Sequence, residues 1–354
     1  MSCRGAALFV IGALTCAWLM TPQLARADAA QAEICAVVGG HGDAREGLLI
    51  GASGQVFEPD DARPGTWRRR FEGGIAVPVR GAIEVEEGRL FASGAVAPVF
   101  RLDQAVWHAH PLPNRGRTIL ARGGGPALAV GRHVYVWRAS RWDRLATLGA
   151  RVTALWPEER GRVLAATVKK QLVRIQPSGA KTPIRLSLAD DDHVSSLVGH
   201  PGAQVYAISQ QGEILRVGAR AATLVTRDPK WAAWEPQAAA VDHDGILWLL
   251  GWTSATDAAP AEALLARVEG RAFAVQRPIS GVAAGDRFRV LHIDRDRRML
   301  FSTASGLVRF SSRPVGSATP EGTPDDLSWL DATLLGEAPI PVSGFPARAP
   351  AHTR

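Results

Sequence analysis

The segment Val205-Tyr206-Ala207-Ile208 is a short apolar run with the length and composition of one β-strand. Runs of this kind recur about every 40 residues, and each is followed by a second segment that ends in a basic or aromatic residue. A period of about 40 that is built from short strands is typical of a β-propeller, in which each repeat forms one four-stranded blade. The sequence therefore predicts an all-β fold, a single propeller of seven four-stranded blades. The seven runs begin at Leu49, Leu90, Leu128, Val163, Val205, Leu247 and Leu300.

Three further segments complete each repeat. An apolar segment precedes the run across a polar turn such as Asp242-His243-Asp244-Gly245, whose Gly and Asp suit the backbone angles of a tight hairpin. A third segment follows the run and carries an arginine, and a fourth, more variable segment often carries a tryptophan. The arginines are Arg101, Arg138, Arg174, Arg216, Arg267 and Arg309, and the tryptophans include Trp67, Trp107 and Trp142.

The chain of 354 residues divides into three predicted parts. Residues 1–29 have the pattern of a cleaved signal peptide, because a basic start precedes an apolar stretch and Ala27-Asp28-Ala29 fits the cleavage site. Residues 30–336 form the predicted propeller, with Leu327 to Leu335 as the outer strand of its last blade. Residues 337–354 are rich in proline, which predicts a flexible C-terminal tail and argues against an eighth blade. We therefore expect a periplasmic or secreted protein with no transmembrane segment in its mature chain.

The composition is that of an ordinary globular protein, with 46% apolar and 21% charged residues. The formal net charge is +7, but the basic residues are scattered, apart from Arg68-Arg69-Arg70, and are not interleaved with stacking aromatic residues. Nucleic-acid binding is therefore not predicted. Removal of the signal peptide would leave Cys35 as the remaining cysteine, so the core is expected to hold the fold without an internal disulfide.

Two segments carry a resemblance to known repeat families. The segment Val241 to Gly251 (VDHDGILWLLG) resembles the Asp-x-x-Gly-x-hydrophobic-Trp repeat of two-component-regulator sensor propellers, and Leu300 to Phe310 follows the second half of that repeat. Leu49 to Phe57, followed by Thr66-Trp67, resembles the repeat of photosystem-assembly-factor-like propellers. These resemblances imply a fold rather than a chemistry. Sensor propellers are followed by a membrane span and signalling domains, so the first resemblance implies, for this chain, a detached sensor domain with a separate membrane partner.

Two groups of residues have the composition of a metal site. Asp190-Asp191-Asp192-His193 offers three carboxylates, which are the oxygen ligands that Ca²⁺ prefers. The run falls where one blade leads into the next, however, and neighbouring strand residues point in opposite directions, so a solvated turn is the favoured interpretation. His108 and His110 would lie on one face of a strand and could form half of a metal site, but the sequence places no third ligand beside them.

The predicted central channel is poor in catalytic groups. The first strand of each blade lines the channel, and the ionisable residues on these strands are Glu84, Arg289 and His292. They do not make up the paired carboxylates or the metal cage that propeller hydrolases and lyases use. The sequence therefore favours a protein without catalytic activity.

The loops that lead into the blades share one face of a propeller, and this face is the predicted binding surface. Arginines combined with tryptophans could receive an anionic or carbohydrate-bearing partner through forked hydrogen bonds and stacking. The candidate binding residues on these loops are Arg80, Arg117, Arg151, Asp192, His193, Trp231, Trp234 and Arg287.

Three functional hypotheses follow from these patterns. The leading one is an exported, non-enzymatic propeller that binds an envelope or extracellular protein or glycan and acts as a scaffold. The second is a metal-dependent propeller hydrolase or lyase, suggested by Asp190 to His193 and by His292. The third is the detached sensor domain that the repeat resemblance implies.

Overall fold

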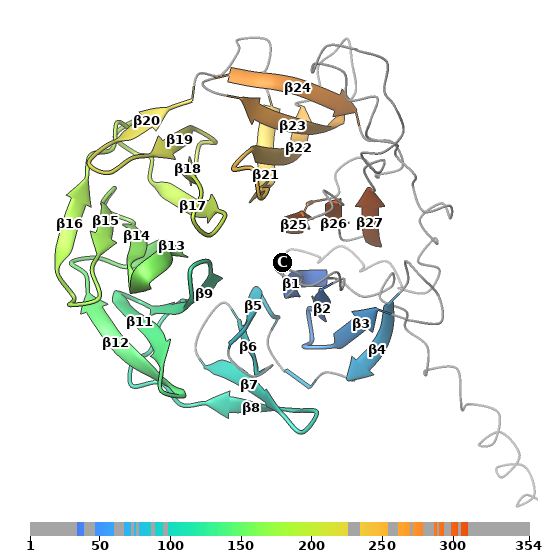
Figure 1. Ribbon diagram of the computed structural model, residues 1–354. Helices are drawn as coiled ribbons and strands as arrows, with labels where there is room; N and C mark the ends of the chain where they lie inside the picture. The colour runs from blue at the N-terminus through green and yellow to red at the C-terminus, as the bar shows by residue number, and fades with distance from the viewer. Residues whose placement is uncertain are drawn as a thin grey trace, which may run out of the picture.

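The computed structural model describes residues 34–38, 47–59, 67–71, 74–75, 78–85, 89–94, 98–225, 234–253, 261–269, 272–278, 287–288, 290–293, 299–303 and 306–310. These residues form seven antiparallel sheets around a central axis, which Figure 1 views end-on. Six sheets have four described strands and the seventh has three. The predicted all-β propeller is therefore confirmed. The signal peptide, the C-terminal tail and the expected outer strand at Leu327 to Leu335 lie outside the described residues.

In every blade the strands follow in sequence order, from the axis to the rim (Figure 1). Blade 1 contains β1 (Ile34–Val38), β2 (Leu48–Gly51), β3 (Val56–Pro59) and β4 (Trp67–Phe71). Blade 2 contains β5 (Gly81–Glu84), β6 (Leu90–Ser93), β7 (Val99–Asp103) and β8 (Val106–His110). Blade 3 contains β9 (Thr118–Arg122), β10 (Pro126–Val130), β11 (His133–Arg138) and β12 (Arg141–Thr147). Blade 4 contains β13 (Val152–Pro157), β14 (Val163–Thr167), β15 (Leu172–Ile175) and β16 (Lys181–Ile184).

The remaining three blades repeat the same order. Blade 5 contains β17 (Val194–Gly199), β18 (Val205–Ser209), β19 (Ile214–Val217) and β20 (Ala222–Leu224). Blade 6 contains β21 (Trp234–Val241), β22 (Leu247–Thr253), β23 (Ala263–Glu269) and β24 (Ala272–Pro278). Blade 7 contains β25 (Val290–Ile293), β26 (Met299–Thr303) and β27 (Gly306–Phe310). The seven apolar runs that define the sequence period all lie in the second strands.

The second strands are apolar because neighbouring blades cover both of their faces. All five residues of β14 are buried, and the same is true of β18 and β26. A strand that is covered on both sides gains from apolar residues at every position, which explains why these runs do not alternate with polar residues.

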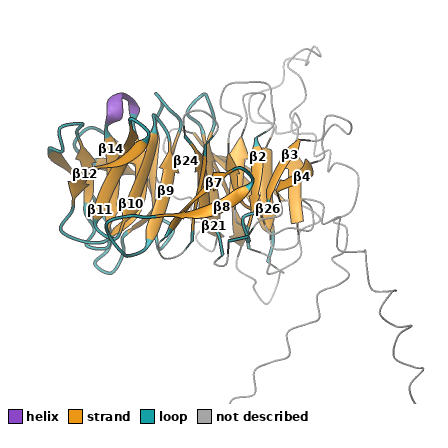
Figure 2. Ribbon diagram, turned by 90° about the horizontal axis from the view of Figure 1, so that it is seen from below, coloured by secondary structure: helices purple, strands orange, loops and turns teal. Residues whose placement is uncertain are grey.

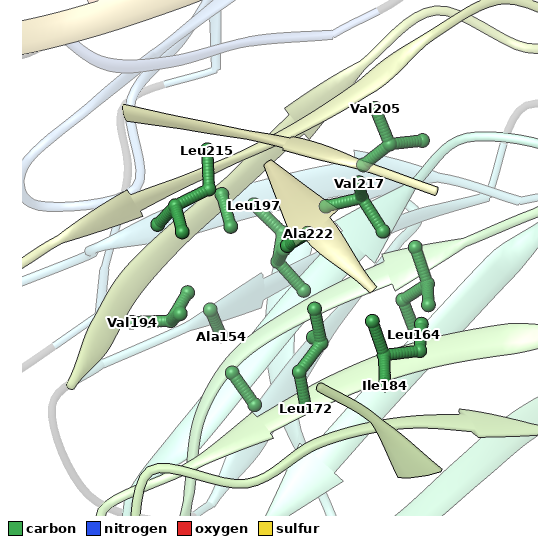
Figure 3. Packing of buried hydrophobic residues seen from close by; sticks show 12 residues of the cluster. Ala154, Leu164, Leu172, Ile184, Val194, Leu197, Val205, Leu215, Val217 and Ala222 are labelled. Atoms are coloured by element: carbon green, nitrogen blue, oxygen red, sulfur yellow. The ribbon is translucent and has the colours of Figure 1, made fainter. Parts of the chain in front are cut away.

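The hydrophobic core is divided among the contacts between blades. Seven clusters of buried side chains each join two neighbouring blades, and the last of them joins blade 7 to blade 1. Figure 3 shows the cluster between blades 4 and 5, which contains Leu164 and Ile184 of blade 4 together with Leu197 and Leu215 of blade 5. Burial of this apolar surface is the main term that holds adjacent blades together.

The alternating strand directions divide the loops between two faces of the ring. The connection into the first strand of a blade and the turn between its second and third strands lie at the same end, which we call the lead-in face. The other turns lie on the opposite face, among them the helical turn η3 (Glu159–Gly161), seen at one side of the ring in Figure 2. Within the described residues, no helix is long and apolar enough to cross a membrane.

Candidate binding face

One residue stands directly before the first strand of each of blades 3, 4 and 5, and the backbone holds it in the same way each time. The carbonyl oxygen of Arg117 accepts a 3.0 Å hydrogen bond from the amide of Gly131. The carbonyl of Arg151 accepts a 3.0 Å hydrogen bond from the amide of Val168, and the carbonyl of His193 accepts a 2.9 Å hydrogen bond from the amide of Gln210. Each donor directly follows the second strand of the same blade. The three side chains therefore start from equivalent places on the lead-in face.

All four predicted binding arginines are exposed at this face. Arg117 and Arg151 are exposed beside their strands, and Arg80 is exposed directly before β5. The amide of Arg80 donates a 2.7 Å hydrogen bond to the carbonyl of Ser93, which fixes its backbone at the start of blade 2. Arg287 is exposed shortly before β25, and His193 is half-buried. The lead-in face thus carries a basic group at the start of blades 2, 3, 4, 5 and 7.

The two predicted tryptophans do not extend this surface among the described residues. Trp234 is only 1% exposed and packs between blades 5 and 6, against residues that include Tyr206 and Leu247. Its indole is therefore part of the core, and it presents no ring to a ligand at the lead-in face. Trp231 lies outside the described residues.

The acidic run before blade 5 separates into exposed and buried members. Asp190 is fully exposed and its carboxylate lies 3.2 Å from the Nζ atom of Lys170, and Asp191 is also exposed. Asp192 is 1% exposed, and its Oδ1 atom accepts hydrogen bonds of 2.7 Å from the amide of His193 and 3.2 Å from that of Gln211. The solvated-turn interpretation is therefore wrong for Asp192, whose carboxylate ties the incoming loop to the turn between β18 and β19.

The metal-binding patterns are not assembled into a cluster in the described part of the chain. No three His, Cys, Asp or Glu side chains come together there in a way that could hold a metal ion. His108 and His110 lie on β8, at the rim of the ring. The ring centroids of His110 and Phe91 lie 5.5 Å apart in a T-shaped arrangement. The pKa of His110 is lowered by burial and then by the nearby charge of Arg101. A lowered pKa favours the neutral form of this imidazole.

The channel strands present few groups that could carry out chemistry. Glu84, at the end of β5, faces Arg122 of β9, with 3.4 Å between carboxylate and guanidinium atoms. His292 is half-buried in β25, and Arg289 lies outside the described residues. Most other described positions on the inner strands are small or apolar, such as Ala82 in β5. This arrangement supplies a structural ion pair and no pair of carboxylates among the described channel residues.

Several further basic residues lie on the same face as the predicted arginines. Arg132 occupies the turn between β10 and β11, and Lys169 and Lys170 occupy the turn between β14 and β15. Arg115 lies in the loop that leads into β9. The residues predicted from the sequence lie on the loops that enter each blade, and none lies in a turn between a second and a third strand. The signal that would have found them is the position of each turn directly after an apolar second strand.

The positive charge of this region acts on a neighbouring histidine. His133, the first residue of β11, has its pKa lowered by burial and further by the adjacent charges of Arg132 and Arg144. Its Nδ1 atom lies 3.0 Å from the hydroxyl of Thr147. Positive charges close to an imidazole disfavour its protonated form, so Arg132 and Arg144 add to the lowering of the pKa that burial causes.

The chain has solved propellers among its structural neighbours, although no protein-family model and no curated protein matches its sequence. A streptogramin B lyase structure superposes with a TM-score of 0.62 at 10% identity, over 80% of this chain and 95% of that one. YCF48 from Cyanidioschyzon merolae gives 0.57 at 13% identity, over 80% and 97%. PorZ, a surface component of the type-IX secretion system of Porphyromonas gingivalis, gives 0.52 at 16% identity, over 80% and 37%. At these identities the similarity shows the propeller fold alone.

Proposed function

We propose that this chain is an exported, non-enzymatic β-propeller that binds a protein or other ligand of the cell envelope through its lead-in face. The observation that carries the proposal is the set of exposed guanidinium groups at equivalent positions, those of Arg80, Arg117 and Arg151. A rigid ring that presents charged groups at regular places suits recognition, because little conformational freedom is lost when a partner binds. Arginine also offers several donors in a fixed fork to anionic groups of that partner.

Other propellers of this fold support a binding role. YCF48 has been solved bound to a D1 peptide, and its structure superposes on this chain with a TM-score of 0.57 at 15% identity. PorZ is a surface component of a secretion system. These are properties of those proteins, and they make protein binding at the cell surface a reasonable role for the present chain.

The binding role is tested by partner capture with face-specific variants. The purified chain is immobilised and exposed to envelope extract of the source cell, beside a variant in which Arg80, Arg117 and Arg151 are changed to Gln. We expect specific proteins or glycans to be retained by the natural chain and lost from the variant. Retention that is identical on both would overturn the assignment of the lead-in face.

Export is tested separately. Residues 1–29 are fused to a phosphatase that folds only outside the cytoplasm. Cells that express this fusion should show phosphatase activity. The same fusion without residues 1–29 is the control. Activity confined to the control, or absent from the full fusion, would contradict a periplasmic or secreted location.

The metal-dependent hydrolase or lyase makes a different prediction. A metal that binds the native state alone raises its melting temperature, and a chelator removes that gain. We expect the melting temperature of the purified chain to be the same with EDTA and with added Ca²⁺ or Zn²⁺. A large, reversible decrease with EDTA would favour the enzyme.

A further inference from the structure

Four loops on the lead-in face of blades 3 and 4 are joined by a continuous series of backbone hydrogen bonds. The amide of Gly131 donates a hydrogen bond to the carbonyl of Arg117, and the amide of Val152 donates one of 2.8 Å to the carbonyl of Gly131. The amide of Val168 donates a hydrogen bond to the carbonyl of Arg151. The amide of Leu148 also donates 2.9 Å to the carbonyl of Arg132. These bonds connect loops of both blades into one surface. We call it the basic sector, which consists of residues 111–117, 131–132, 148–151 and 168–171.

A close approach of two glycines brings the first two of these loops together. A Cβ atom on Gly116 would lie 3.1 Å from both the Cα and the nitrogen of Gly131, and Gly116 has a φ of 144°. A larger residue would not fit there without moving the backbone. Because the loops touch at their glycines, the neighbouring Arg115, Arg117 and Arg132 start from adjacent points on the surface.

The basic sector contains cationic side chains and no acidic residue. Its five exposed cations are Arg115, Arg117, Arg132, Arg151 and Lys169. Lys170 also lies here, and its ammonium group faces Asp190 from the next connection at 3.2 Å.

The four arginines of the sector have no ion-pair partner among the described residues, unlike Lys170. Among the residues that the structure describes, no carboxylate lies within ion-pair distance of the four arginines. Some arginines elsewhere are matched, as where Arg174 forms a 2.8 Å ion pair with Glu158. Like charges held side by side repel one another, so an anionic ligand would relieve an unfavourable arrangement.

We propose that the basic sector binds an extended, acidic polypeptide segment of a partner protein. This inference rests on the proposed function and names the chemistry of the ligand for that binding face. A ligand that reaches from Arg117 on blade 3 to Arg151 and Lys169 on blade 4 must be extended. A single exposed ion pair contributes little, so the ligand needs several carboxylates that are engaged at once.

The kinds of side chain in the sector favour a polypeptide over a single-stranded nucleic acid. The planar guanidinium fork matches the two oxygens of a carboxylate, and arginine predominates over lysine here. The four loops contain no aromatic residue. Single-stranded nucleic acids are held largely by stacking of bases on aromatic side chains, and the sector offers no such surface.

The test compares two triple variants that carry the same change of charge. In the first, Arg117, Arg132 and Arg151 are each replaced by Gln. In the matched control, Arg138, Arg160 and Arg220, which are exposed on the opposite face, are replaced by Gln. The probe is a fluorescent peptide of about ten glutamates, and binding is measured by anisotropy at low and at physiological salt, where surface charge interactions differ in strength. Melting temperatures of all three proteins verify that each is folded.

We expect the natural chain to bind the glutamate peptide and to bind it more weakly as salt increases. The sector variant should lose at least about tenfold in affinity, and the control should lose less than about threefold. A peptide of glutamines should not bind. Equal loss in both triple variants would show a non-specific charge effect and overturn the proposal.

Two further ligands separate the inference from the proposed function. A polyuronate or a sulfated polysaccharide that binds more tightly than the glutamate peptide would overturn the polypeptide assignment in favour of an anionic glycan. If the glutamate peptide fails to bind while the envelope extract still yields a partner that depends on Arg80, Arg117 and Arg151, then the inference is wrong and the proposed function stands. Failure of both experiments would reject both.

Discussion

The hydroxyl of Ser302, in β26 of the last blade, donates a 2.8 Å hydrogen bond to the carbonyl oxygen of Ile34, the first residue of β1. This bond joins two residues from opposite ends of the described chain and closes the ring. Leu300 of the same strand packs against Ile34 and Leu49 beside it. A hydroxyl-to-carbonyl bond of 2.6 Å also joins Thr153, in the first strand of blade 4, to Val194 of blade 5, so hydrogen bonds of this kind link neighbouring blades elsewhere in the ring.

Replacing Ser302 by Ala should weaken the closure. Ser302 has 0% exposure, so water cannot readily replace the lost hydroxyl, and we expect the free energy of unfolding to decrease by about 1–3 kcal/mol in urea denaturation. Ser195 is the matched control, because its hydroxyl also donates a hydrogen bond, of 3.1 Å, to a backbone carbonyl, that of Ile208, but the residue is exposed. Ser195→Ala should cost about 0.5 kcal/mol or less. Equal losses would contradict a special role for the closing bond.

Replacing Asp242 should disrupt the hairpin between β21 and β22. Its Oδ1 atom accepts hydrogen bonds of 3.0 Å from the amide of Asp244 and 2.9 Å from that of Ile246, and its Oδ2 accepts 2.9 Å from the indole of Trp248. Asp242 is 2% exposed. We expect Asp242→Ala to lower the free energy of unfolding by about 3 kcal/mol, because three donors lose a buried charged acceptor.

Two other substitutions at this hairpin calibrate that result. Asp242→Asn keeps one acceptor but places an amide group beside the indole of Trp248, so its cost should be intermediate. Asp244→Ala, at a half-exposed turn position, should cost about 0.5 kcal/mol or less. A chemical denaturation series in which Asp242→Ala costs no more than Asp244→Ala would disprove the structural role of the buried carboxylate.

The glycine contact in the basic sector gives a prediction about backbone fit. Gly116→Ala would place its Cβ 3.1 Å from the backbone of Gly131 at a φ of 144°, so we expect a loss of about 1–3 kcal/mol in stability. We also expect weaker binding of the glutamate peptide, because Arg115 and Arg117 would be displaced. Gly149→Ala is the control in the same sector, since a Cβ there meets nothing within 4 Å. Its stability should remain within about 0.5 kcal/mol of the natural chain.

The lowered pKa of His133 makes the charge of the sector measurable by NMR. Arg132→Gln removes one of the two charges that disfavour the protonated ring, so the pKa of His133 should increase toward the ordinary value of 6.5. Burial and Arg144 remain, so part of the shift should persist. Arg138→Gln, at the opposite end of β11, should leave the pKa unchanged.

The same shift determines how His133 affects stability. Because its pKa is lower in the folded chain than in the unfolded one, the unfolded chain takes up a proton first as pH decreases through 6.5. The contribution of His133 is therefore present above that pH and is lost as pH falls toward the folded-state pKa. Arg132→Gln should reduce this loss, and a pH dependence that is identical in both proteins would contradict the assignment.

The second strands could be predicted from the sequence because their burial is local and complete. A run such as Val205 to Ile208 is apolar at every position, and the structure places it in β18, between two blades. The aromatic residues of the outer strands, such as Trp67 at the start of β4, could be predicted because they recur at a regular position in the repeat. The period therefore contains most of the information that specifies the architecture.

The residues of the candidate site could be predicted only where their location follows from their position in the sequence repeat. Arg117 and Arg151 stand directly before their strands, and that placement follows from the repeat. The burial of Trp234 depends on side chains of the neighbouring blade, and the role of Asp192 depends on the amide of Gln211 in another turn. Contacts of this kind bring together residues that are distant in sequence, and no local pattern predicts them.

Every described blade is built from strands that are consecutive in the sequence, including β1 to β4 of blade 1 and the described strands of blade 7. A blade is therefore a self-contained unit that corresponds to one uninterrupted stretch of gene. Duplication or deletion of such a stretch would add or remove a whole blade without dividing any described sheet. The number of blades, and with it the diameter of the ring, is thus a quantity that evolution could change in single steps.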